Sequence, residues 1–208
     1  TIIGLAWLDE FLLAGGGQYV DIISFHMYPQ AEVERELPLI TGLRNLMQNH
    51  GVSSKPLWNT EGSVGANTGV PGDPASGASG AMPDGQARAG VARSYIGQWA
   101  YGVSNFSWYT WEHNWNGQVW FSTSADGWKN PLAGGVAYRE VGNWLKGAQM
   151  TGKWVDSSGF WTVEIKRANG YVGRIVWHQQ GHSFNWTIPA GWGTQRVRHL
   201  NGTSSSIY

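Results

Sequence analysis

The stretch VDIISFHMYP, at residues 20–29, decides the fold. Residues 20–27 are apolar and rich in β-branched and aromatic side chains, which predicts a short buried strand that ends before Pro29. Residues 31–50 then place Val, Leu and Ile at helical spacing, which predicts an amphipathic helix. KPLWNT, at residues 55–60, predicts a second strand. A strand, a helix and a second strand in this order form a crossover unit whose two strands run parallel.

The alternation of strands and helices continues on both sides of this unit. A helix over residues 5–14 precedes it and stops at three consecutive glycines, and Asp84 is placed to cap a later helix. The other predicted segments are a loop over 62–83, a helix over 85–101, a strand over 103–111, a loop over 112–132 and a helix over 134–146. Three successive crossovers predict a parallel sheet covered by helices, with its chemistry at the carboxyl ends of the strands.

The pattern changes after Gly147. Period-two strands are predicted at residues 160–167, 171–177, 183–188 and 196–200. Asn169 and Gly170, between two of these runs, form a good hairpin signal. The chain therefore divides into an α/β part over residues 1–148 and a small antiparallel β part over residues 149–208.

Composition excludes several classes of partner. The 208 residues are 41% hydrophobic, so a real core is expected, and the net charge is zero with no basic stripe. Nucleic acid and anionic membranes are therefore not expected partners. The chain has no cysteine and no His-Glu-x-x-His spacing, so we expect no metal and no cofactor. The first residues lack the basic start and cleavage site of a signal peptide.

The chain contains 14 Trp, where about two are expected for this length. Such an excess has two interpretations of similar weight. The rings can be packing in a large core, or they can be flat apolar platforms for sugar rings. Trp108 and Trp111 are three residues apart, so a regular strand turns only one of them toward a site at its end.

Polar side chains gather at the predicted strand ends. Glu61 ends a buried strand and precedes Gly62, so its desolvation must be offset by a catalytic use or by a partner such as a helix end or loop amides. His26 and Tyr28 share one strand face. They are either core residues or donors to a common site, where a Tyr hydroxyl bonded to a carboxylate favours its ionised form.

The order of these motifs resembles a known family. DIISFHMYP, KPLWNTEG, VSNFSWYTWEHN and the helix ending in YREVGNWLKGA together resemble the C-terminal half of a clan A glycoside hydrolase barrel. In that clan the sixth strand often ends in His-x-Tyr, the seventh carries the nucleophilic Glu and the eighth supplies an aromatic floor. The tail, with RIVWHQQG and HLNGTSSS, looks like part of the β-sandwich that follows the barrel in several families of the clan.

The resemblance implies both a fold and a chemistry. The fold is α/β, a partial (half) TIM barrel of three to four βα units followed by a small antiparallel β domain. The activity is that of a retaining hydrolase of β-glycosidic bonds in polysaccharide or oligosaccharide. Glu61 would be the nucleophile, Tyr28 its hydrogen-bond partner and His26 a contact to a substrate hydroxyl. The remaining implied substrate contacts are Asn59, Trp108, Trp111 and Glu112.

The resemblance also implies a second carboxyl group. In clan A the acid/base Glu follows an Asn at the end of the fourth strand, and no Asn-Glu pair occurs in this sequence. The chain is therefore expected to hold half of the catalytic pair, with weak hydrolysis or none when isolated. The apolar wall of a half-barrel should be covered by an N-terminal half-barrel, by self-association or by a rearranged fold. The complete enzyme is expected to be secreted or periplasmic.

Two other functions compete with the enzyme. A non-catalytic carbohydrate-binding protein would use the Trp-rich loops as its sugar surface. A different α/β hydrolase would need a Gly-x-Ser-x-Gly elbow, which Gly62-Ser63-Val64-Gly65 does not fit.

Overall fold

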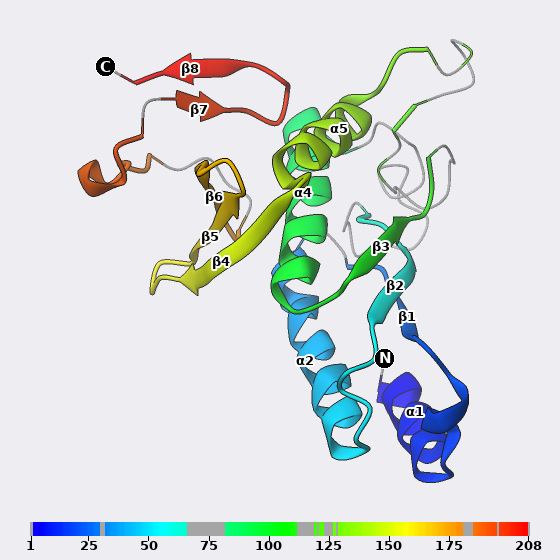
Figure 1. Cartoon of the computed structure of the whole chain (residues 1–208). Helices are drawn as coiled ribbons and strands as arrows, with labels where there is room; N and C mark the ends of the chain where they lie inside the picture. The colour runs from blue at the N-terminus through cyan, green and yellow to red at the C-terminus, as the bar shows by residue number, and fades with distance from the viewer. Residues whose placement is uncertain are drawn as a thin grey trace.

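The computed structural model describes residues 2–29, 32–65, 82–111, 129–180, 185–194 and 196–207, with residues 119, 121, 122 and 127. Three layers follow one another (Figure 1): a parallel sheet, a layer of helices and an antiparallel sheet. This is a mixed α/β architecture with a parallel sheet followed by antiparallel strands. None of the helices in the described ranges has the length and apolar character needed to cross a membrane.

The parallel sheet has the strand order β1 (Ile23–Met27), β2 (Leu57–Gly62) and β3 (Asn105–Trp108). Both pairs of neighbouring strands are parallel, as the crossover pattern predicts. The helices of this part are α1 (Ile2–Leu13), α2 (Val33–Asn49), α4 (Asp84–Ala100) and α5 (Ala133–Leu145), with a short 3-10 helix η1 (Gly16–Tyr19) after α1.

The two faces of the parallel sheet differ in polarity. Toward the helices the sheet places Ile23, Met27 and Leu57, all of them buried. The opposite face, here called the open face, carries half-buried Trp58 and five exposed residues, which are Ser24, His26, Thr60, Asn105 and Ser107. Because this face is largely polar, exposing it to water costs less free energy than exposing the apolar wall that the sequence predicts.

Helix α2 confirms its predicted apolar face, because Val33, Leu37, Ile40, Leu43 and Met47 are all buried. Leu37, Ile40, Leu43 and Met47 pack with α1 and the sheet in one core cluster, whereas Val33 belongs to a second cluster with Val64 and Val91. The predicted cap of α4 is wrong. Pro83 is the N-cap residue and makes no side-chain cap bond, whereas Asp84 is the first helical residue.

The antiparallel sheet consists of β4 (Ala148–Val155), β5 (Phe160–Arg167) and β6 (Val172–His178) in sequence order. The predicted hairpin joins β5 to β6, and Gly170 supplies the positive φ of 84° that its turn requires. The two-stranded sheet β7 (Arg196–Arg198) and β8 (Ser204–Ser206) follows the 3-10 helix η3 (Ala190–Trp192).

Two expectations for this part fail. Strand β4 was not among the predicted strands, although its residues alternate apolar with polar from Ala148 to Thr151; Gly152 interrupts the pattern at the point where the pairing with β5 shifts register. The strand expected over 183–188 does not form at residues 185–188, which are the described part of it. Pro189 follows directly, and proline cannot donate to a sheet ladder.

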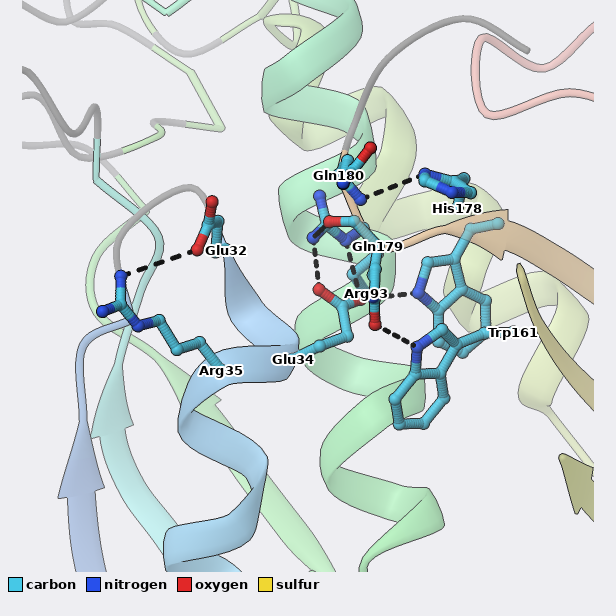
Figure 2. A network of polar contacts seen from close by, with 9 residues as sticks. Glu32, Glu34, Arg35, Arg93, Trp161, His178, Gln179 and Gln180 are labelled. Carbon is cyan, nitrogen blue, oxygen red and sulfur yellow. Dashed lines mark hydrogen bonds and ion pairs between the residues drawn. The ribbon is translucent and has the colours of Figure 1, made fainter. Parts of the chain in front are cut away.

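A buried ion pair fastens the antiparallel sheet to the helices (Figure 2). Arg93 of α4 binds both carboxylate oxygens of Glu34 of α2, with an Nε to Oε1 distance of 2.8 Å. Trp177 of β6 donates its indole N–H to Glu34 at 2.5 Å, and Arg93 donates to the carbonyl of Gln179 at 2.6 Å. We call these four residues the clamp. Trp177 of the clamp also stacks on Trp161, with ring centroids 5.3 Å apart.

Candidate active site

Glu61 lies at the carboxyl end of β2, the central strand of the parallel sheet. Phe25 pairs with Asn59, and the next residue of β1, His26, pairs with Glu61. Thr60 is therefore an extra residue in β2, which is a β-bulge. Strict alternation would place Glu61 on the same face as Asn59, toward the helices. The bulge turns Glu61 to the open face instead, where 37% of its side chain is exposed.

Two side chains from the end of β1 contact the Glu61 carboxylate. The Tyr28 hydroxyl donates a hydrogen bond to Oε1, and His26 Nδ1 lies 3.8 Å from Oε2. Burial raises the pKa of Tyr28 well above its usual value, and the hydrogen bond to Glu61, the charge of Glu61 and the charge of Tyr109 act in the same direction. Tyr28 thus remains a proton donor to Glu61 throughout the neutral range.

Asn59 does not face the open face. Its side chain is fully buried on the side of the helices, and its amide lies 2.9 Å from that of Gln98 in α4. The expectation that Asn59 contacts substrate is therefore wrong. Side chains alternate between the two faces of a strand, and Asn59 lies two residues after Leu57 and before the bulge. Asn59 therefore shares the covered face with Leu57.

The two candidate tryptophans have different environments. Trp108 is half-buried, donates its indole N–H to the carbonyl of Val119 at 3.2 Å and stacks on Phe121 at 5.1 Å. Trp111 is 50% exposed and touches Phe121 and Tyr138 edge-on. Of the two, Trp111 has the exposed ring that a sugar could contact. Glu112 lies outside the described residues.

Three aromatic or amide side chains near the site were not singled out in the sequence. Tyr109 lies close enough to Tyr28 to affect its pKa, and its backbone N–H donates to the carbonyl of Gly62 at 2.8 Å. Tyr138 is 39% exposed beside Trp111. Nothing in the sequence distinguishes these tyrosines from packing residues. Gln98 is a buried polar residue of α4, as Arg93 and Ser94 are, so its sequence position does not single it out.

The described residues contain no group of three or more His, Cys, Asp or Glu side chains that could hold a metal ion. A half-exposed carboxylate with one strong donor is an acceptor or a nucleophile.

Comparison with solved structures shows similarity in fold to glycoside hydrolases. A glucosidase from Croceicoccus marinus is 18% identical with a TM-score of 0.54, and the match covers 96% of this chain and 41% of the glucosidase. A GH128 (subgroup I) endo-β-1,3-glucanase from Amycolatopsis mediterranei, in complex with laminaripentaose, is 20% identical with a TM-score of 0.43. That match covers 65% of this chain and 52% of the glucanase.

A second structure of the same glucanase, in complex with laminaritriose and laminaribiose, is 22% identical with a TM-score of 0.40. No protein-family model and no curated protein matches the sequence. This chain spans about half the length of the glucanase and less than half that of the glucosidase.

Proposed function

We propose that this chain carries the nucleophile of a retaining β-glycosidase that acts on polysaccharide or oligosaccharide, and that Glu61 is this nucleophile. The observation that supports the proposal most strongly is the hydrogen bond from Tyr28 to Glu61 at the carboxyl end of the central parallel strand. A carboxylate that accepts a tyrosine hydrogen bond on an open sheet face is suited to attack an anomeric carbon.

The proposed reaction needs a second carboxyl group about 5–5.5 Å from the first, to protonate the leaving group and then activate water. The sequence contains no Asn-Glu pair, so the acid/base group that the resemblance implies is not among these residues. The open face supports the further proposal that the three parallel strands belong to a half-barrel. An N-terminal half-barrel, or a second copy of this chain, would complete it.

Covalent labelling tests this proposal without the acid/base group. In a 2,4-dinitrophenyl 2-deoxy-2-fluoro-β-glucoside the leaving phenolate needs no proton, and the fluorine slows hydrolysis of the glycosyl-enzyme. Oε of Glu61 would form a bond to C1 as the bond from C1 to the phenolate oxygen breaks. A gluco-configured probe comes first because the similar structure with the higher TM-score is a glucosidase; galacto-, manno- and xylo-configured probes follow.

Mass spectrometry of the peptides should find the sugar on Glu61 and not in the Glu61→Gln variant. A label on another carboxylate, or equal labelling of the variant, would overturn the assignment of the nucleophile.

A carbohydrate-binding protein without catalysis is a second candidate, which the exposed rings of Trp111 and Tyr138 favour. It would bind β-glucan oligosaccharides with the same affinity in the Glu61→Gln variant and lose binding in Trp111→Ala. The labelling experiment separates the two candidates, because a binding protein without catalysis forms no covalent glycosyl-enzyme at Glu61.

A further inference from the structure

The bulge at Thr60 places Glu61 on the open face, so whatever holds the bulge also sets the direction of the carboxylate. A bulge interrupts the regular ladder and leaves the backbone of the extra residue unpaired. In β2 the register shifts against both neighbouring strands at this point. The local backbone therefore needs support from side chains.

That support comes from the buried amide of Asn59. In one orientation its oxygen accepts from the backbone N–H of Glu61 at 3.3 Å. In the other, which satisfies more groups, its nitrogen donates to the carbonyls of Glu61 at 2.8 Å and Phe25 at 3.1 Å. Both orientations hold the main chain of Glu61, and the second also ties it to β1.

Gln98 of α4 holds Asn59 in turn. Its side chain is 1% exposed, and its amide lies 2.9 Å from the amide of Asn59. A buried amide costs free energy unless it is hydrogen-bonded, so packing alone would favour an apolar residue at this position. Gly62 leaves room for the contact, because a Cβ there would lie 2.9 Å from Nδ2 of Asn59 and 2.3 Å from the carbonyl oxygen of Met27.

We propose that Gln98 is a positioning residue for Glu61 that acts through Asn59 and the bulge. Gln98 contacts no substrate, and it lies on the opposite side of the sheet from the open face. Its effect on the main chain of Glu61 rests on geometry alone. Its effect on glycosyl transfer rests on the proposed function.

The first test follows the contact between Tyr28 and Glu61 by NMR. The chain is labelled with ¹³Cζ-tyrosine, the Tyr28 signal is assigned with Tyr28→Phe, and its chemical shift at pH 7 is compared in the unmodified chain, in Glu61→Gln and in Gln98→Met. Loss of the Gln98 amide should let the bulge relax and move the Tyr28 signal toward its position in Glu61→Gln, where the carboxylate acceptor is removed. Ile96→Val is the matched control, because Ile96 is equally buried on the same helix. An unchanged Tyr28 signal in folded Gln98→Met, or an equal change in Ile96→Val, would overturn the proposal.

If Gln98→Met does not fold, Gln98→Asn replaces it. This variant keeps an amide that is one methylene too short, and a Tyr28 chemical shift equal to that of the unmodified chain would then refute the proposal. The second test measures labelling by the fluoroglucoside. We expect the maximal labelling rate of Gln98→Met to fall at least tenfold with little change in half-saturation. An unmodified chain that is not labelled speaks against the proposed function alone, because the NMR measurement still decides the role of Gln98.

Discussion

The clamp allows a quantitative test of how the antiparallel sheet is attached. The side chains of Arg93 and Glu34 are only 6% and 7% exposed, so neither charge is solvated by bulk water. Removing one partner of a buried ion pair costs about 3–5 kcal/mol, because the other charge stays buried. Arg93→Met leaves Glu34 with the indole N–H of Trp177 alone, and Glu34→Leu leaves Arg93 with the carbonyl of Gln179.

The double variant removes both charges at once. It leaves the indole N–H of Trp177 and the carbonyl of Gln179 without these partners, at about 1–3 kcal/mol each. We therefore expect a cost of about 4 kcal/mol for the double variant, against about 8 kcal/mol for the two single costs added together. The difference predicts a coupling energy of about 4 kcal/mol between Arg93 and Glu34.

Urea unfolding followed by tryptophan fluorescence measures each free energy of unfolding. Asp84→Asn is the matched control, because Asp84 pairs with Arg88 four residues away on the exposed side of α4 and is 75% exposed. Such a surface pair contributes about 0.3–0.5 kcal/mol. If Arg93→Met costs no more than Asp84→Asn, or if the two clamp substitutions are additive, the clamp does not hold the sheet.

Three further predictions concern two glycines of α5, the two candidate tryptophans and Tyr28. In α5, Gly135→Ala should destabilise by about 1–3 kcal/mol, because its Cβ would lie 2.3 Å from the carbonyl oxygen of Phe121. Gly142→Ala should stabilise by about 0.5–1 kcal/mol in urea unfolding, since no atom of the described residues lies within 4 Å of the added Cβ. Equal effects of the two substitutions would contradict this reasoning. Trp108→Ala should cost about 3–5 kcal/mol of stability. Exposed Trp111→Ala should leave stability nearly unchanged and, under the proposed function, weaken β-glucan binding. A larger loss of stability in Trp111→Ala than in Trp108→Ala would contradict the burial of these two rings. Because the folded-state pKa of Tyr28 is raised, its contribution to stability is present below the unfolded pKa of about 10 and is lost as the pH rises above it. The free energy of unfolding should therefore fall more between pH 8 and pH 11 in the unmodified chain than in Tyr28→Phe, and equal falls would refute the assignment.

The order of helices and strands in the α/β part is readable from the sequence because short apolar runs predict the strands and Gly and Pro residues mark where elements end. The apolar stripe of α2 and the alternation in β5 are each strong enough to predict the element that forms. Strand β4 is different, since Gly152 interrupts its alternation and the strand is completed by its pairing with β5.

The candidate site is only partly readable. The sequence can indicate that two adjacent parallel strands end at the same edge of the sheet. The contact between Tyr28 and Glu61 follows from that arrangement. The bulge at Thr60 cannot be predicted from the regular alternation of side chains along a strand, because that alternation places Asn59 and Glu61 on the same face. Asn59 was expected among the substrate contacts because of the family resemblance, whereas its buried amide contacts the main chain of Glu61 from the covered face.

The clamp also bears on where this chain can be divided. Residue 148, where the sequence predicts a change of domain, lies at the start of β4. A protein shortened at that point would expose Ala92, Ile96 and Val141, which pack against Val163 and Ile165 of β5. It would also leave the Arg93 and Glu34 pair without its cover of Trp177. The antiparallel sheet is thus not an exchangeable module: grafting it elsewhere, or expressing either piece alone, should yield aggregating protein.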